Sequence, residues 1–186
     1  MREPIQYDEV TGLPERGHLW SLLDDSLKMI RRNKMNAGVL LIKLNDLSNI
    51  TDSLGQSSAN KFLNVIGSRI KNSLWDLDTA TRFEDDKIVI VANSIKKLED
   101  IHIVMKKVQE YLSLDLTIND KSISPSTSIG IALLPIDAMQ ADEIMSYAYE
   151  ALNTAIPKGK NSYSYYNSVY PVRPSWTVRH QGKLGF

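Results

Sequence analysis

The stretch Ala80-Thr-Arg-Phe-Glu84-Asp85-Asp86-Lys87-Ile88-Val-Ile-Val91 places two short apolar segments on either side of an acidic turn. Residues 79–83 and 87–92 are rich in β-branched and aromatic side chains and are too short for helices, so they predict a β-hairpin. The two-residue turn is expected at Glu84-Asp85, with Asp86 just after it. Three neighbouring carboxylates repel one another, and the simplest interpretation is a solvated acidic turn.

On both sides of this hairpin, segments with the apolar spacing of helices alternate with segments typical of strands. Residues 37–44 form a continuous apolar run, which is typical of a central strand covered on both faces. The spacing predicts helices over 14–33, 46–54, 58–75, 98–112 and 141–155, further strands over 127–134 and 162–166, and a second hairpin over 114–124. We therefore expect an α/β (α+β) fold in which helices pack on the faces of one mixed sheet.

The composition is that of one domain. The chain has 186 residues and no cysteine, which excludes disulfides and thiolate metal sites. No apolar run reaches the length of about 18 residues that a membrane span needs, and the first residues do not resemble a signal peptide. We expect a cytoplasmic domain without membrane insertion, or a domain cut from a larger protein. His18, His102 and His180 are scattered and suggest no metal site.

Charge is unevenly distributed along the chain. The first 150 residues hold 17 basic and 22 acidic residues, a net charge of −5, and five basic residues after Glu150 give the remainder +5. Because no basic cluster is tighter than Lys158 and Lys160, the expected contact of the basic tail is the acidic body of its own protein. The tyrosines from Tyr163 to Tyr170 lack interleaved Lys or Arg, so we expect them to pack the last strand and not to bind nucleic acid.

Three segments resemble the GGDEF domain family, the diguanylate cyclases that join two GTP into cyclic di-GMP. Asp8-Glu-Val-Thr-Gly-Leu-Pro-Glu-Arg16 is similar to their D-x-L-T-G-L-x-N-R opening, Ser128-Ile-Gly-Ile-Ala132 matches their S-I-G-I-A strand, and residues 148–161 follow the spacing of their closing helix and turn. The resemblance implies a five-stranded, mostly antiparallel sheet of the nucleotidyl cyclase and polymerase palm type. It divides the chain into an N-terminal wrap (1–13), a GGDEF domain (14–166) and an extended tail or linker (167–186).

The opening hairpin falls on the family signature and departs from it. Where the family has R-x-G-G-D-E-F, this chain has Arg82-Phe-Glu84-Asp85-Asp86-Lys87-Ile88. Both glycines are replaced by acids, and the second acid of the signature, a magnesium ligand, is replaced by Lys87. The other magnesium ligand, at the end of the first strand, is replaced by Lys43. Because Mg²⁺ binds hard oxygen ligands and an ammonium repels it, the resemblance implies a degenerate member with no metal site and no catalytic residue.

The lysine at position 43 has three interpretations. It reaches solvent from the strand end or pairs with Asp86 across the adjacent strands, which we favour. It could instead be catalytic, because buried lysines shift their pKa readily. A third hypothesis is that Lys43 and Lys87 together hold a nucleotide phosphate without metal, although Glu84 and Asp85 oppose an anion there.

The positions that bind nucleotide in the family are also changed. Thr51 and Asn60 replace the Asn and Asp that read the guanine, and a neutral amide is a weaker acceptor than a carboxylate. Ile156 replaces a phosphate-binding Lys, whereas Lys160 conservatively replaces an Arg. The product-inhibition motif R-x-x-D appears as Trp75-Asp-Leu-Asp78, without its arginine. We treat Thr51, Asn60, Lys160, Trp75 and Asp78 as vestigial site residues.

These observations favour a catalytically inactive GGDEF domain that acts as a regulatory or interaction module in bacterial cyclic di-GMP signalling. Its expected partners are neighbouring signalling domains, such as a sensor or an EAL phosphodiesterase domain, other proteins, or a second copy of the chain. Two alternatives stay open. One is a GTP-binding allosteric domain without turnover, and the other is a weakly active diguanylate cyclase that works through Asp86. Mg²⁺ and GTP are expected as cofactor and substrate only in the cyclase alternative.

Overall fold

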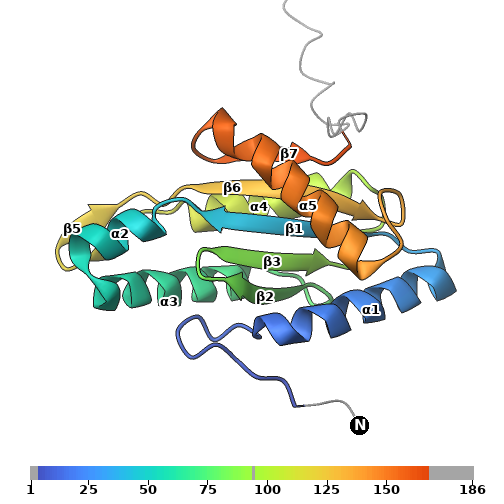
Figure 1. The fold of residues 1–186 in the computed structure, drawn as a ribbon, viewed down its shortest axis with the longest axis horizontal. Helices are drawn as coiled ribbons and strands as arrows, with labels where there is room; N and C mark the ends of the chain where they lie inside the picture. Colours follow the sequence, from blue (N-terminus) through green and yellow to red (C-terminus); the bar gives the residue numbers. More distant parts are fainter. Residues whose placement is uncertain (1–3, 94, 168–186) are drawn as a thin grey trace, which may run out of the picture.

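The computed structural model describes residues 4–93 and 95–167, which fold around one five-stranded sheet. The strand order is β2-β3-β1-β6-β7; all neighbours run antiparallel except β6 and β7, which are parallel (Figure 1). The strands of this sheet are β1 (Ala37–Leu44), β2 (Thr79–Glu84), β3 (Lys87–Ala92), β6 (Thr127–Leu134) and β7 (Ser162–Tyr165). A separate small hairpin pairs β4 (Leu116–Ile118) with β5 (Lys121–Ile123). The predicted fold class is confirmed.

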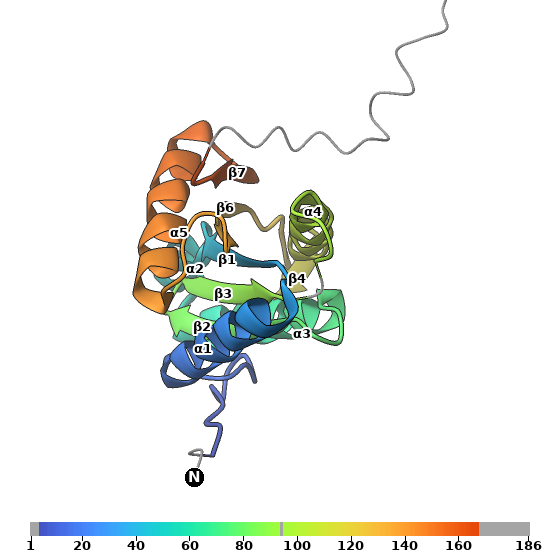
Figure 2. The same ribbon diagram turned by 90° about the vertical axis from the view of Figure 1, so that its right-hand side faces the viewer.

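Helices cover both faces of the sheet, so that the domain has three layers (Figure 2). One face carries α1 (Arg16–Asn33) and α5 (Ala141–Ala155), and the other carries α3 (Gln56–Ser73) and α4 (Asp100–Leu112). Two short helices, α2 (Leu47–Leu54) and η1 (Ile156–Lys158), complete the set. No helix within the described ranges is long and apolar enough to cross a membrane.

Strand β1 supplies side chains to both cores. Val39 and Leu41 pack with α1 and α5, whereas Leu40 and Ile42 pack with α3 and α4, and all four are fully buried. Alternate residues of a strand point to opposite faces, so the part of a strand that lies between two helical layers is mostly apolar on both faces. This is the reason why the run 37–44 predicted a central strand correctly.

The structure corrects two local predictions. Glu84 is the last residue of β2 and pairs with Lys87, so the turn lies at Asp85-Asp86, one residue later than predicted. Helix α1 begins at Arg16, because Pro14 instead forms an isolated bridge with Tyr7. The predicted tail or linker (167–186) lies, apart from Asn167, outside the described residues.

Gly130 allows α5 to lie directly on β6. A Cβ atom at this position would overlap the α5 backbone at Ala148 and Leu152. Any side chain would therefore push the helix away from the sheet, and Ala148 and Leu152 are themselves buried in that interface. This contact gives a physical reason for glycine within the Ser128–Ala132 strand.

We expect Gly130→Ala to lower the free energy of unfolding by about 1–3 kcal/mol, the usual cost of overpacking. The matched control is Gly17→Ala in α1, where nothing lies within 4 Å of the added methyl group. Because alanine is favoured in helices, this control should leave stability unchanged or raise it by up to about 1 kcal/mol. Urea unfolding of the two variants measures the difference, and equal stability of the two would contradict the close approach of α5.

Candidate functional site: a hairpin closed by its own charges

The β2–β3 hairpin forms its acidic turn without glycine. The pairing register shifts between Arg82 and Glu84, which marks a β-bulge in β2. Positive φ angles among the described non-glycine residues occur only at Lys34, Asn119, Asp120 and Asn161. The turn at Asp85-Asp86 therefore avoids the left-handed region that favours glycine. The second hairpin does use that region, with φ of 50° and 63° at Asn119 and Asp120.

The ammonium of Lys87 lies between two of the three acids of the turn. Its Nζ donates hydrogen bonds to Glu84 Oε2 at 2.8 Å and to Asp86 Oδ1 at 2.9 Å. The Lys87 side chain is only 18% exposed, whereas its two partners are about a third exposed. Of the three carboxylates, only Asp85 belongs to an exposed residue. The predicted solvated acidic turn therefore describes Asp85, whereas Glu84 and Asp86 are about a third exposed and share the Lys87 ammonium.

The pKa values of the cluster reflect this pairing. Burial opposes the charge of Lys87, but the hydrogen bonds to Glu84 and Asp86 prevail and raise its pKa to about 12. Burial likewise opposes the charge of Glu84, but hydrogen bonds from Lys87 and Tyr149 lower its pKa. At neutral pH the cluster is therefore a charged network, in which each ionised group stabilises its neighbour.

The hairpin is tied to α5 and α1 through adjacent residues of β2. The hydroxyl of Tyr149 on α5 donates a hydrogen bond to Glu84 Oε1. Burial and this hydrogen bond raise the pKa of Tyr149 to about 12. Phe83 packs against the Tyr149 ring and carries the guanidinium of Arg16 over its face, 4.3 Å from the ring centre. These contacts fix the end of β2 against both helices of that layer.

Arg82 ties the hairpin to the N-terminal segment. Its Nη1 donates to both carboxylate oxygens of Asp8, at 3.0 and 2.9 Å, and its Nη2 donates to the carbonyl of Asp85 at 3.2 Å. Asp8 also accepts hydrogen bonds from the amide and the hydroxyl of Thr11. Burial opposes the charge of Asp8, but these partners lower its pKa. One arginine thus joins the chain before α1 to the turn of the hairpin.

The donor set of the cluster does not suit Mg²⁺. Lys43 lies directly opposite Lys87 in the β1–β3 register, and its Nζ is 3.9 Å from Asp86 Oδ2. Asp86 is therefore flanked by two ammonium groups, and a divalent cation near it would be repelled by both. Among the described residues, no group of three or more His, Asp or Glu side chains is arranged to hold a metal ion. The predicted cross-strand pair of Lys43 and Asp86 is present.

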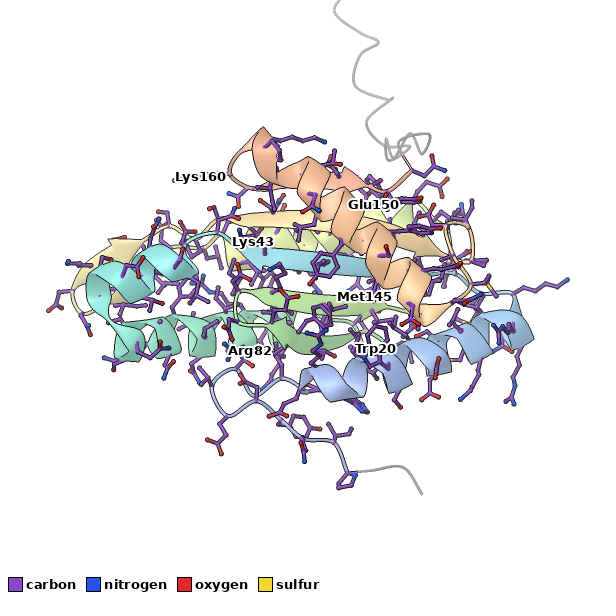
Figure 3. All side chains as sticks on the ribbon, viewed as in Figure 1. Trp20, Lys43, Arg82, Met145, Glu150 and Lys160 are labelled. Atoms are coloured by element: carbon purple, nitrogen blue, oxygen red, sulfur yellow. The ribbon has the colours of Figure 1, made fainter. Side chains whose placement is uncertain are left out.

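The predicted guanine-reading residues do not join this cluster. Thr51 uses its hydroxyl within α2, where it donates to the carbonyl of Leu47. Asn60 lines an open hollow of about 770 Å³ between α3 and the segment Glu9-Val10, and its amide oxygen accepts a hydrogen bond from Gln56. None of the hairpin acids lines that hollow. Lys160 is exposed in the loop before β7, at the same end of the sheet as Lys43 and Arg82 (Figure 3).

The predicted inhibitory site is occupied by structural contacts. Asp78 is 7% exposed, and its carboxylate accepts hydrogen bonds from the backbone amides of Trp75 and Asn93. Trp75 in turn packs near Lys107, whose Nζ is 5.6 Å from the ring centre. The Asp78 carboxylate therefore holds the open end of the β2–β3 hairpin.

The comparisons with known proteins identify the family. The family model "Diguanylate cyclase, GGDEF domain" matches residues 5–162. The chain belongs to the GGDEF family. Cyclic di-GMP phosphodiesterase NbdA of Pseudomonas aeruginosa is 24% identical over 184 residues, which cover 99% of this chain and 23% of that protein. The chain spans about a fifth to a quarter of the length of the first curated relatives that it matches.

Solved GGDEF domains share the fold. The GGDEF domain of TpbB (YfiN) from P. aeruginosa superposes with a TM-score of 0.83 at 23% identity, covering 87% of this chain and 95% of that one. The diguanylate cyclase SiaD from P. aeruginosa, solved in complex with its activator SiaC, gives a TM-score of 0.79 at 19% identity. The match covers 86% of this chain and 61% of the SiaD chain. At this identity the likeness establishes the fold alone.

Sequence reasoning missed two contacts of the site. It did not predict that Tyr149 binds Glu84, because the two residues are 65 positions apart and no motif links them. It also did not name Arg82 as the partner of Asp8, although their opposite charges and their places in the two motifs were a usable signal. Both contacts depend on how distant elements cross, which periodicity does not specify.

We expect Lys87→Met to lower the free energy of unfolding by about 1–2 kcal/mol at neutral pH, because Glu84 and Asp86 lose a shared, partly screened cation. The raised pKa of Lys87 means that its contribution is complete below its ordinary pKa of 10.5 and is lost as pH rises through about 12. Because the pKa of Glu84 is lowered, the stability that its pair with Lys87 contributes is also lost as pH falls below 4.5, the ordinary pKa of a glutamate. Urea unfolding as a function of pH measures both limits.

The control for this prediction is Lys28→Met. Lys28 pairs with Asp25 at 3.6 Å but is 63% exposed, so its removal should cost less than about 0.5 kcal/mol. A loss of stability for Lys87→Met no larger than that for Lys28→Met would contradict the proposed role of the partly buried Lys87 ammonium.

Proposed function

We propose that this chain is a catalytically inactive GGDEF domain that serves as a regulatory or interaction module in a multidomain protein of cyclic di-GMP signalling. The observation that carries the proposal is that Lys87, which replaces a magnesium-binding acid of the family signature, is an ammonium that binds the carboxylates of both Glu84 and Asp86. A triphosphate approaching the turn also meets the exposed acid Asp85 in place of a glycine. The signature is thus degenerate in charge as well as in sequence.

The regulatory role is supported by the relatives and by the contacts of the hairpin. The related NbdA is a cyclic di-GMP phosphodiesterase of which this chain matches 23%, so that most of that protein lies outside the matching region. The related cyclase SiaD binds an activator protein. In this chain the hairpin is joined to the N-terminal segment by Arg82 and to α5 by Glu84. Such contacts suit a domain that is held rigid between its neighbours.

A direct assay tests the absence of turnover. We expect the chain to form no cyclic di-GMP above a blank when it is incubated with GTP and Mg²⁺ and the products are separated by liquid chromatography. The variant Glu84→Gly/Asp85→Gly/Lys43→Asp/Lys87→Glu restores the residues of the family signature and should bind Mg²⁺ measurably. Cyclic di-GMP formed by the unmodified chain, and lost in Asp86→Ala, would overturn the proposal.

A second candidate, GTP binding without turnover, is favoured by one observation. Lys43 keeps a third of its side chain exposed and lies 3.9 Å from Asp86, farther than a hydrogen bond. Its ammonium therefore has donors available for a phosphate without displacing the tighter pairs of Lys87. Calorimetric titration with GTP, in Mg²⁺ and again in EDTA, tests this second candidate. GTP binding through Lys43 should be equally strong in both solutions and should be lost in Lys43→Met.

A further inference from the structure

An open hollow of about 890 Å³ lies between the N-terminal segment and the first half of α1. Residues 4–6 form one wall, in which Ile5 is 42% exposed. The other wall is the side of α1 that faces away from the sheet, with His18, Leu22 and Asp25. Figure 1 shows α1 along the lower edge of the domain, with the N-terminal segment beneath its first turns. Apolar surface therefore faces solvent beside α1, in a space that admits the side chains of a partner.

The hollow and its surroundings are negatively charged. Residues 4–25 hold five acids and one base, a net charge of −4. The base is Arg16, whose guanidinium stacks on an aromatic ring of β2. None of the described lysines and arginines lines the hollow, whereas Glu15 and Asp25 do. Asp24 and Asp25 lie in the middle of α1, where the helix dipole does not favour an acid. The hollow therefore suits an occupant that is both basic and apolar.

The second half of α1 has the complementary charge. Residues 26–36 hold four basic residues and no acid, a net charge of +4. Arg32 is exposed and, seven residues after Asp25, lies on the same side of the helix. The half-buried Met29 lies seven residues after Leu22 in the same way, and its flexible thioether adapts readily to an apolar surface. One face of α1 is therefore acidic in its first half and basic in its second half, with apolar side chains in both.

We propose that α1 packs antiparallel against α1 of a second copy of this chain, with the basic end of each helix in the hollow of the other copy. A face that is negative in one half and positive in the other complements itself when it is turned by 180°, as a two-fold symmetric dimer requires. Helix α1 spans Arg16–Asn33, so full overlap of the two helices brings Arg32 of one copy beside Glu15 of the other. Met29 then contacts the apolar wall of the hollow. Each of these contacts occurs twice in the dimer.

The contact between the two copies is small and largely electrostatic. A helix of 18 residues is about 27 Å long, and one such face buries less than the roughly 800 Å² per partner of a standard interface. We therefore expect a weak dimer, whose population rises wherever two copies are held close together. Because the contact uses α1 and the N-terminal segment, it does not depend on whether the hairpin site is catalytic.

Sedimentation velocity of the full chain tests the dimer. We expect the dimer fraction to rise as the protein concentration increases from about 10 μM to about 1 mM. It should fall when the NaCl concentration is raised from about 50 mM to about 500 mM, because salt screens the paired charges. A chain that stays monomeric over this whole range would overturn the proposal. A dimer whose population does not change with salt would overturn it as well, because the contact would then not be made by opposite charges.

A charge exchange between two chains tests the pairing. Glu15→Arg and Arg32→Glu should each weaken dimerisation about tenfold, because like charges then face each other twice in the symmetric dimer. An equimolar mixture of the two variants should restore the dimer, since each new charge then meets an opposite charge on the other chain.

The matched controls are Glu110→Arg and Lys106→Glu, two exposed positions on α4, in the helical layer on the opposite face of the sheet. Both controls should leave dimerisation unchanged. Failure of the mixture to restore the dimer would show that Glu15 and Arg32 are not partners, and would overturn the proposal. An equal effect of the controls would overturn it too, because net charge alone would then govern the association.

Discussion

The Lys87 ammonium, held between Glu84 and Asp86, is the interaction on which the rest of this site depends. It allows two carboxylates to stand within hydrogen-bond distance of one cation in a partly buried turn, where without that cation they would repel each other. It also leaves the second oxygen of Glu84 available to Tyr149 on α5. The ammonium thus performs by itself the electrostatic task that a bound metal ion performs between acids.

The β2–β3 hairpin therefore connects several separate segments of the domain. Arg82 connects the turn to Asp8 in the segment before α1, and Glu84 connects the end of β2 to α5. Asp78 fixes the opposite end of the hairpin through the backbone of Trp75 and Asn93. The side chains of Arg82, Glu84 and Asp78 are therefore bound to the protein itself, which agrees with the proposed role as a regulatory module.

The sequence predicted the fold well because the fold rests on local periodicity. The apolar run 37–44 coincides with β1, and the alternation of Ile129, Ile131 and Leu133 correctly predicted β6 (Thr127–Leu134). The turn of the hairpin was predicted one residue too early, because the β-bulge between Arg82 and Glu84 shifts the register and leaves no mark in composition. The pairing of Lys43 with Asp86 was predictable from adjacent strands, whereas the contact of Tyr149 with Glu84 depends on the path of α5 across the sheet.

The ammonium signal of Lys87 in ¹H–¹⁵N NMR spectra, assigned with the Lys87→Met variant, reports whether this cation stays between Glu84 and Asp86. We expect a charged, hydrogen-bonded ammonium whose signal persists at neutral pH and does not change when Mg²⁺ and GTP are added together. Loss or displacement of that signal on addition of Mg²⁺ and GTP would show that the acids exchange Lys87 for a metal ion, and would contradict the account.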